Sequence, residues 1–355
     1  MTVGGWKIYE YPTLPPEHAV TQSVSGAIAS KAESGSVHWD APNPRRSFVR
    51  GAVYTANGRL VELSQRKGGM NSDMVLSVNP PVLSSRERAE STANMYRGRW
   101  LYAGSWMHGF GHFLVETLPT LWPLVEGRDD FDGICAHRFN SLRTFEWQFD
   151  LLGFLTDKPV HVVDDVPSSY EELIVVARPY HYQVAIHPIA TAAWDAIAGR
   201  ATAGAPDEDT TPVYLSRSRF QADQESRGVV SGREVRNSED VDDVFASRGF
   251  RIAFPETLSV TEQIRLARSA SVLAGAAGSA LHLSVFAKPG ARVIELGDAR
   301  TRSRVVATQQ AISSVKHQLT AQIAYTERGA GVIDLQLLDE SLAALLPTNE
   351  DLAVG

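Results

Sequence analysis

The chain contains almost no cysteine, because Cys135 is the only one among its 355 residues. An intrachain disulfide is therefore excluded, and a zinc site built from cysteines is not expected. So little cysteine fits the reducing interior of a cell. We therefore expect a cytoplasmic protein.

Long hydrophobic runs are also missing. The longest apolar stretches, such as residues 173–177 and 271–280, are far shorter than the roughly 20 residues that cross a bilayer. The first residues, MTVGGWKIYEYPTLPPEHA, lack the basic start and apolar centre of a signal peptide. We expect no transmembrane segment, and any membrane contact should be peripheral.

An excess of positive charge is absent as well. The chain has 34 Lys and Arg against 41 Asp and Glu, which gives a formal net charge of -7. This balance argues against a surface that wraps nucleic acid, and it disfavours highly anionic polymers as partners. Apolar and charged contents of 43% and 21% are those of a globular protein. The sequence does not indicate an oligomeric state.

The length predicts two domains rather than a single core. Residues 1–200 are interpreted as an N-terminal α/β domain, with residues 1 to about 40 as an irregular arm rich in Pro, Ser and Gly. Residues 201–212, ATAGAPDEDTTP, have the small, acidic and proline-bounded composition of a linker. A second α/β domain is expected over 213–330, followed by a C-terminal helix and tail over 331–355.

Strands and helices are predicted to alternate on both sides of the linker, which favours mostly parallel sheets. Within residues 46–63, Asn57-Gly58 predicts a two-residue hairpin turn. Ser259 followed by Glu262 predicts a capping box, and Asn237 followed by Asp240 resembles one. The expected strands are 99–103, 133–136, 160–163, 173–177, 213–216, 251–254, 272–274 and 293–294. The expected helices are 111–126, 141–152, 188–200, 237–247 and 259–269.

The segment 271–295, SVLAGAAGSALHLSVFAKPGARVIE, has the order strand, glycine turn, helix, strand. Gly275 and Gly278 permit a tight turn, and Ser279 is expected to open a helix whose free N–H groups point at an anion. The carboxyl edge of a parallel sheet is where open α/β folds bind ligands. Such a turn serves a packing role equally often, so both interpretations stay open at this point.

A second strand-to-helix turn occupies residues 104–116, GSWMHGFGHFLVE. With a helix starting near Gly111, His112 and Glu116 are four residues apart and share a face. A carboxylate beside an imidazole raises its basicity and fixes its tautomer, which suits proton abstraction at neutral pH. The alternative is an inert, hydrogen-bonded histidine in a capped helix. His108 is a further candidate base in the preceding loop.

Four places in the sequence carry residue types that can bind a metal. His108, His112 and Glu116 supply two imidazoles and a carboxylate, but the His-Glu-x-x-His pattern is absent. The acidic clusters at 130–132 and 207–209 are interpreted as turn or surface residues. The pair at 164–165 closes an expected strand and is the one to reconsider if the reaction requires a metal. We expect neither a metal nor a cofactor.

Arginines gather near the predicted strand ends of the second half. Arg217 and Arg219 follow its first strand, while Arg233 and Arg236 precede the helix expected from residue 237. The planar guanidinium suits diphosphate oxygens. Scattered arginines are more often a solvated surface, but these share one sheet edge with the glycine turn.

The sequence resembles glycosyltransferase family 61, whose bacterial members are often labelled capsular-polysaccharide biosynthesis proteins. GHFLVETLPTLWPL at 111–124 resembles the family's Gly-His-aromatic-x-x-Glu-x-Leu-Pro segment. YLSRSRF at 214–220, the 233–237 segment, Gly249-Phe250, the 259–286 segment and VIEL at 293–296 follow its order and spacing. The similarity covers about a third of the chain.

The resemblance implies a GT-B-type pair of Rossmann-like domains facing across a cleft. It also implies a nucleotide-sugar donor and an inverting, metal-independent transfer of a hexosyl or pentosyl group to a hydroxyl. His112 and Glu116 would face the acceptor, one of them as base, with His108 behind them. Donor contacts would come from the second half: Arg217, Arg219, Arg233, Gly275, Gly278, Ser279, Ala280, and Glu295 at the ribose.

Two positions depart from the family pattern. Ala277 stands where members commonly have a histidine, and Asn237 is followed by Ser238 where members often have Glu. A missing imidazole would remove a hydrogen bond or a positive charge from the leaving group, a role that His282 could take over. A fold-retaining binding or scaffold protein is therefore the main alternative. A nicotinamide- or methyl-donor-dependent enzyme is disfavoured, because no full Gly-x-Gly-x-x-Gly turn with a later acidic residue is present.

Overall fold

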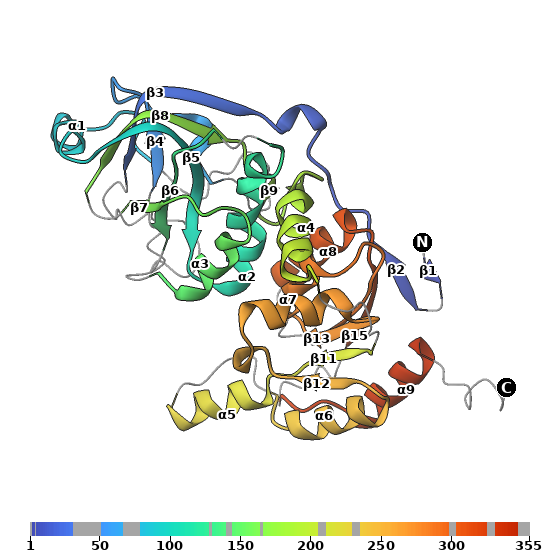
Figure 1. Ribbon diagram of the computed structural model, residues 1–355. Helices are drawn as coiled ribbons and strands as arrows, with labels where there is room; N and C mark the ends of the chain where they lie inside the picture. Colours follow the sequence, from blue (N-terminus) through green and yellow to red (C-terminus); the bar gives the residue numbers. More distant parts are fainter. Residues whose placement is uncertain are drawn as a thin grey trace, which may run out of the picture. The chain divides into compact units, whose positions relative to one another are not determined.

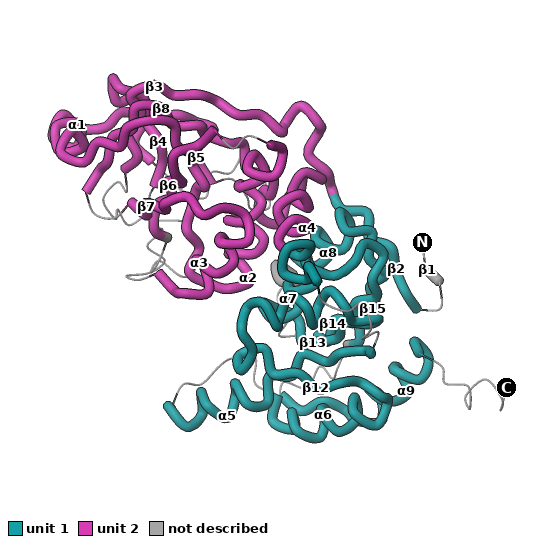
Figure 2. Tube along the Cα trace, in the orientation of Figure 1, with its two compact units in different colours: residues 1–11, 198–355 teal, residues 12–197 magenta. Residues whose placement is uncertain are grey.

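The computed structural model describes most of the chain, in two compact units. Residues 12–197 form the N-terminal unit, and residues 198–355 together with 1–11 form the C-terminal unit (Figure 2). The predicted linker began three residues after this division, and its residues 205–210 lie outside the described part. The described residues are 2–3, 5–30, 51–66, 79–127, 130–139, 144–163, 166–204, 211–228, 235–297, 303–324 and 331–346.

The N-terminal unit is built on a six-stranded sheet with the order β4-β3-β8-β5-β6-β7 (Figure 1). Strands β8, β5, β6 and β7 are parallel, whereas β3 is antiparallel to both of its neighbours. A separate short hairpin pairs β9 with β10. The strands are β3 (Thr21–Ser30), β4 (Ala52–Tyr54), β5 (Met95–Met107), β6 (Gly133–Phe139), β7 (Val160–Val163), β8 (Ser168–Val176), β9 (Tyr180–His181) and β10 (Ala185–Ile186).

Helical segments connect and follow the strands of this sheet, and α4 crosses from residues of the N-terminal unit into those of the C-terminal unit. Trp194 of α4 donates its indole N–H to the carbonyl of Leu114 over 2.7 Å, which anchors α4 to the segment after β5. The segments are α1 (Ser85–Ser91), α2 (Phe110–His112), a π-helix (Phe113–Thr117), α3 (Glu146–Gly153), α4 (Ala190–Ala201), and 3-10 helices at Pro16–His18, Glu62–Ser64 and Leu118–Leu124.

The C-terminal unit contains a seven-stranded sheet with the order β1-β2-β15-β14-β13-β11-β12. Its five strands from β11 to β15 are parallel, and in chain order they run 2-1-3-4-5, a doubly wound arrangement. Strand β2 pairs antiparallel with β15. The strands are β1 (Thr2–Val3), β2 (Trp6–Ile8), β11 (Val213–Leu215), β12 (Arg251–Ala253), β13 (Val272–Ala276), β14 (Arg292–Gly297) and β15 (Leu319–Ala324).

Helices cover both faces of the second sheet (Figure 1). Apolar residues of α6 and α9, such as Phe245 and Leu342, pack with Ile294 and Leu296 on one face. Helices α7 and α8 lie on the other face. The helices are α5 (Ser218–Ser226), α6 (Ser238–Ser247), α7 (Val260–Ser269), α8 (Ser303–Val315), α9 (Leu335–Leu345), and 3-10 helices at Pro255–Thr257 and Leu281–Phe286.

The structure confirms the α/β fold and most of the predicted elements. The chain turns back near Asn57-Gly58, with a φ of 81° at Gly58 and a bridge between Tyr54 and Leu60. The two-residue length of the predicted turn is wrong, because the Thr55 N–H bonds to the carbonyl of Arg59 and residues 56–58 form the loop. The capping box of Ser259 and Glu262 is also present. The predicted Asn237 cap is wrong, because the Asn237 side chain bonds to the backbone of Ile333 instead. Parts of four predicted elements lie outside the described residues: 31–40 of the arm, 46–50 of the hairpin segment, 141–143 of a helix and 347–355 of the C-terminal tail.

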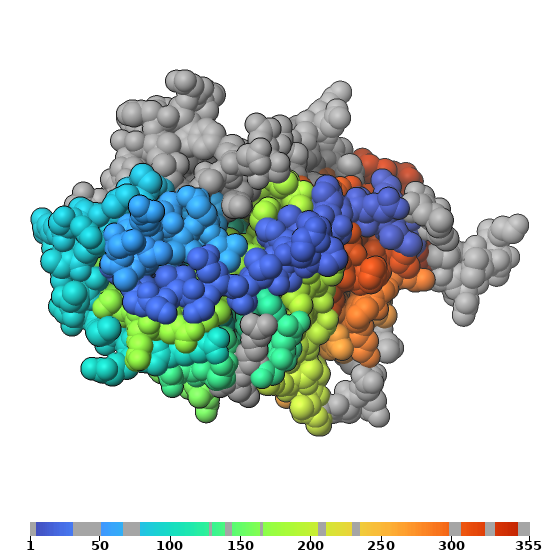
Figure 3. All heavy atoms as spheres, turned by 90° about the horizontal axis from the view of Figure 1, so that it is seen from above, coloured from blue at the N-terminus to red at the C-terminus, as the bar shows by residue number. Residues whose placement is uncertain are grey.

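The prediction of an irregular arm over the first 40 residues is wrong in two places. Residues 6–8 form β2 and extend the sheet of the C-terminal unit. Residues 21–30 form β3, which pairs with β8 along nearly its whole length. The first half of β3 lies on the surface of the N-terminal unit (Figure 3). Its apolar side chains are concentrated at one end, so no alternating pattern marks it in the sequence.

The predicted helix over 111–126 is present over 110–124 but changes from α to π to 3-10 along its length. Pro119 has no N–H to donate to the carbonyl of Val115, and its ring crowds that carbonyl. The helix widens before it, and the Leu118 N–H bonds to the carbonyl of Phe113. Pro123 interrupts the ladder again. Two prolines therefore shape the segment that carries Glu116.

No helix among the described residues is long and apolar enough to cross a membrane.

Candidate active site

In the N-terminal unit, the candidate site lies at the carboxyl ends of β5 and β8. These strands are parallel neighbours, and the chain leaves β5 for β6 on its other side. Adjacent strands whose connections diverge leave a crevice at this edge, which is where open α/β sheets bind ligands. The turn with His112 and Glu116 follows β5, as the sequence predicts.

The helical segment after β5 is fixed to the strand by side-chain hydrogen bonds. Thr117 donates its hydroxyl to the carbonyl of Ser105 over 2.8 Å, and Thr120 donates to the carbonyl of Ala103 over 2.9 Å. From α3, Gln148 donates to the carbonyl of Met107 over 2.9 Å. All these groups are buried, so the position of Glu116 on this segment is well determined.

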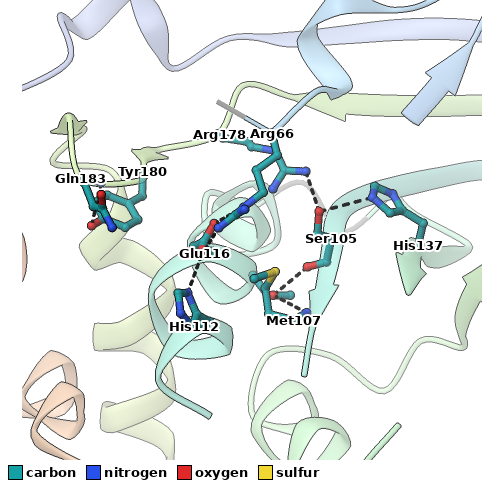
Figure 4. A network of polar contacts seen from close by, with 10 residues as sticks. Arg66, Ser105, Met107, His112, Glu116, His137, Arg178, Tyr180 and Gln183 are labelled. Atoms are coloured by element: carbon teal, nitrogen blue, oxygen red, sulfur yellow. Dashed lines mark hydrogen bonds and ion pairs between the residues drawn. The ribbon is translucent and has the colours of Figure 1, made fainter. Parts of the chain in front are cut away.

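Glu116 is the centre of a buried polar network (Figure 4). Its carboxylate accepts two hydrogen bonds from Arg66, Nε to Oε2 over 2.6 Å and Nη2 to Oε1 over 2.9 Å. His112 Nδ1 lies 2.7 Å from Oε1. The Glu116 and Arg66 side chains are only 2% and 7% exposed, whereas that of His112 is 42% exposed. His112 is therefore the solvent-exposed member of the network.

Electrostatics assign different chemistry to the two predicted base candidates. Burial by itself would raise the pKa of the Glu116 carboxyl, but the charge of Arg66 and the hydrogen bonds of His112 and Arg66 hold this pKa well below its usual range. Glu116 is therefore ionised and too weak a base to remove a hydroxyl proton at neutral pH. The Glu116 carboxylate accepts a hydrogen bond from Nδ1–H of His112, which keeps the proton of the neutral imidazole on Nδ1. Nε2 of His112 is then able to accept a proton.

The β9–β10 hairpin follows β8 and borders this network. The guanidinium of Arg66 lies 5.2 Å from the ring centroid of Tyr182, and the ring of His112 lies 5.3 Å from it. Gln183 has a φ of 65°, and its backbone N–H donates to the hydroxyl of Tyr180 over 3.2 Å. Non-glycine residues with positive φ are uncommon and cluster at functional sites.

The third candidate, His108, is not part of the network. Its exposed side chain lies edge-on to Phe145, with ring centroids 5.4 Å apart. His108, His112 and Glu116 do not form a metal cluster, and no group of three or more His, Cys, Asp or Glu in the described ranges could hold one. Asp130 and Asp132 contact Arg99, and the acidic residues at 164–165 and 207–209 lie outside the described part.

The C-terminal unit presents the second candidate site, at the carboxyl ends of β11 and β13. These neighbouring strands are the point where the order 2-1-3-4-5 reverses, the switch point of a doubly wound sheet. Arg217 lies two residues after β11 and precedes α5, with its guanidinium 5.3 Å from the ring centroid of Phe220. Arg219 stacks on Phe254, the residue after β12, at 4.0 Å. Both arginines therefore lie at the predicted edge.

The glycine turn lies at the same edge, after β13. Gly278 has a φ of 139°, which favours glycine, and Ser279 is exposed. Gly275 is buried within β13 between Leu215 and Leu281. The predicted helix at Ser279 is wrong: residues 277–280 form turns, and a six-residue 3-10 helix follows at Leu281–Phe286.

Glu295 projects from β14 into the protein, and 2% of its surface is exposed. Gln322 of the neighbouring β15 donates to its Oε2 over 2.8 Å, while its buried Oε1 has no partner among the described residues. Burial raises the pKa of Glu295 to about 7. A half-satisfied carboxyl beside the glycine turn suits a hydroxyl-bearing ligand. His282 is buried in the 3-10 helix after the turn, Ala280 precedes that helix, and Arg233 lies outside the described part.

Two buried arginines of the N-terminal site were not identified from the sequence. Arg178 follows the predicted strand 173–177 directly, so its place at the strand's carboxyl end was a usable signal. Arg66 lies 50 residues from Glu116 and belongs to no predicted element, so no local pattern pointed to it.

Comparison with known families identifies the family to which the chain belongs. Residues 110–294, just over half of the chain, match the family model Glycosyltransferase 61. The match begins at the turn with His112 and ends in β14. The protein is thus a glycosyltransferase by family. It belongs to glycosyltransferase family 61, and no curated protein shows significant similarity to the chain.

Proposed function

We propose that this protein is an inverting glycosyltransferase that moves a hexosyl or pentosyl group from a nucleotide-sugar to a hydroxyl, without a metal ion. The observation that carries the proposal is the hydrogen bond of 2.7 Å between His112 and the buried, arginine-paired Glu116. The two units act as the acceptor and donor halves of a GT-B-type enzyme. The acceptor is a glycan, a glycoconjugate or a small molecule in cytoplasmic, capsule-type polysaccharide synthesis of a bacterium.

In this reaction His112 is the general base. Nε2 of His112 takes the proton of the acceptor hydroxyl while the oxygen attacks the anomeric carbon. The bond from that carbon to the diphosphate breaks on the opposite side, which inverts the configuration. Glu116 orients the imidazole and stabilises the imidazolium that forms. Arg66 holds Glu116 in place and keeps it ionised.

The C-terminal unit binds the donor in this proposal. The departing diphosphate takes up the electron pair of the broken bond, and Arg217 with the backbone of the 278–280 turn stabilises its charge. Arg219 extends the positive edge, and Arg233, which lies outside the described residues, stays a predicted donor contact. Glu295 accepts a hydrogen bond from a ribose hydroxyl through Oε1, the atom that has no protein partner in the described structure. Because arginines supply the positive charge, a metal is not needed.

Ala277 supports one alternative, a binding or scaffold protein that has lost activity. The Ala277 N–H bonds to the carbonyl of Leu296 over 2.7 Å, so its backbone is committed to the sheet. Its methyl group supplies no charge to a leaving group. His282, which follows in the 3-10 helix, is the imidazole that remains near this turn.

Two experiments test the proposal. A thermal-shift screen of common sugar nucleotides identifies the donor, since a ligand at a hundred times its dissociation constant stabilises the folded state by about 2.7 kcal/mol. Release of the nucleoside diphosphate is then followed in the presence of a chelator. Turnover that His112→Ala abolishes while donor binding persists supports the enzyme. Saturable binding without any turnover supports the scaffold, and wild-type turnover in His112→Ala rejects His112 as the base.

A further inference from the structure

Arg178 is a buried cation with few partners. It lies two residues beyond β8, is 6% exposed, and borders the Glu116 network (Figure 4). Its Nη2 donates to Ser105 Oγ over 3.1 Å. Its Nε is buried and has no hydrogen-bond partner in the described part of the chain. A guanidinium has five N–H donors, so this group keeps unused capacity.

Strand β5 is shaped to accommodate this guanidinium. Gly104 has a φ of 71°, and a Cβ added there would lie 2.9 Å from Nη2 of Arg178. The pairing of β5 with β6 shifts register between Tyr102 and Ser105, which is the signature of a bulge at this point. A larger residue at 104 would displace the arginine. The strand is therefore built around Arg178.

Among the described residues, the groups around Arg178 do not balance its charge. Both oxygens of Glu116 are occupied by Arg66 and His112, so this carboxylate is shared with another arginine. On the other side, Ser105 Oγ lies 3.3 Å from Nε2 of His137. Burial, together with the charge of Arg178, lowers the pKa of His137 to about 3, so this imidazole is neutral. The described cluster therefore holds two cations and one anion.

An excess buried cation is costly unless an anion compensates it. Arginine cannot avoid this cost by losing its proton, because it stays charged at any physiological pH. Arg178 also lies at the carboxyl edge between β5 and β8, where the sheet's ligand is expected. The net charge of -7 is a property of the whole chain, whereas the potential at this cluster is set by its own groups.

We propose that Arg178, with Ser105, binds an oxyanion of the acceptor, so that the acceptor is a sugar or glycan carrying a carboxylate or phosphate group. The inference rests on the proposed function, since His112 of the same unit is the base for that acceptor. Nε and Nη2 of one guanidinium can hold two oxygens of a carboxylate or phosphate side by side. The anion then fixes the acceptor while its hydroxyl reaches His112.

The test measures binding of simple probes to the full-length protein at constant ionic strength. Glucuronate, inorganic phosphate and, as the neutral control, glucose are titrated by thermal shift. Wild type is expected to bind glucuronate, phosphate or both, but not glucose. Arg178→Gln should weaken anion binding by about tenfold or more, and Arg178→Lys should weaken it less. Arg227→Gln, an exposed arginine paired with Asp223 in the other unit, should leave it unchanged.

If Arg178→Gln fails to fold, Arg178→Lys and Ser105→Ala still decide the question. Preference for glucuronate assigns a carboxylate to the acceptor, and preference for phosphate assigns a phosphate; both support the site. Binding of neither anion by wild type overturns the inference, as does wild-type affinity in the Arg178 variants. An Arg178→Lys protein that loses sugar-nucleotide affinity but keeps anion affinity also overturns it, because Arg178 would then serve the donor.

Hydrolysis of the sugar nucleotide in the same preparations separates the two proposals. Hydrolysis without anion binding rejects the acceptor anion and leaves the glycosyltransferase mechanism standing. Arg178-dependent anion binding with no hydrolysis or transfer supports the anion site while rejecting the catalytic proposal.

Discussion

Nδ1 of His112 lies 2.7 Å from Oε1 of Glu116, and both oxygens of this carboxylate accept hydrogen bonds from Arg66. The arginine makes the carboxylate a poor base, and the carboxylate in turn leaves Nε2 of the imidazole as the proton acceptor. In the proposed mechanism, His112 therefore transfers the proton and Glu116 orients the imidazole, and both residues belong to one helical segment. A substitution of either residue therefore tests one of these two roles.

Glu116→Gln should lower the turnover number by about 10²–10⁴-fold, the usual contribution of general acid–base catalysis. The amide cannot act as an anionic acceptor for Nδ1–H or stabilise the imidazolium. Donor affinity, measured by calorimetry, should stay unchanged because the proposed donor site lies in the C-terminal unit. Glu126→Gln, at an exposed position shortly after the same segment, is the control and should behave like wild type.

The same variant leaves Arg66 without its carboxylate, and breaking a buried ion pair typically costs about 3–5 kcal/mol. Urea unfolding of Glu116→Gln should show a loss of this order. Arg66→Met combined with Glu116→Gln should recover much of the stability but not the activity. Recovery of activity in the double variant would contradict the role assigned to Glu116.

Glu295 should give the folded protein a pH-dependent stability. The unfolded chain releases this proton near the ordinary glutamate pKa of 4.5, whereas burial raises the pKa to about 7 in the folded protein. Between these values the unfolded state binds fewer protons, so the free energy of unfolding decreases as pH rises. In wild type this decrease in the free energy of unfolding is at most about 3 kcal/mol, and it should be absent in Glu295→Gln. Urea unfolding at about pH 5 and about pH 8 measures it; an equal difference between variant and wild type at both values would refute the assignment.

Arg217→Ala should weaken binding of the sugar nucleotide by about 10–100-fold, because hydrogen bonds to a charged group contribute about 1.5–3 kcal/mol. The matched control is Arg227→Ala at the other end of α5, where the exposed guanidinium pairs with Asp223. Calorimetry with the donor found in the thermal-shift screen compares the two. Equal affinities would remove Arg217 from the donor site.

Gln183→Gly should maintain or increase stability, by up to about 1–2 kcal/mol, because the left-handed conformation at φ 65° strains a residue with a side chain. It should also raise the KM for the acceptor, since the buried Nε2 of Gln183 has no described partner and is available to a ligand. His317→Gly, at an exposed position with φ 53°, should relieve similar strain with unchanged kinetics. A wild-type KM in Gln183→Gly would separate the strain from acceptor binding.

Much of the fold could be predicted where the signal is local. The correctly predicted features depend on residues that are neighbours in the sequence. They include the strands at 133–136 and 160–163, the capping box of Ser259, and the change of chain direction near Gly58. β3 was not found, because its burial is concentrated at one end and its partner β8 is about 150 residues away. The change to a π-helix before Pro119 required knowledge of backbone packing as well as of the proline itself.

The sequence by itself determined that Glu116 reaches His112, since four residues on one helical face fix their distance. It also determined that both glycine turns lie at carboxyl ends of parallel strands. Only the tertiary structure decided what these residues can do. Tertiary packing brings Arg66 to Glu116 and places Arg178 beside them, from distant parts of the chain. The charge of Arg66 keeps the buried carboxylate ionised, which is the basis for the orienting role proposed for Glu116.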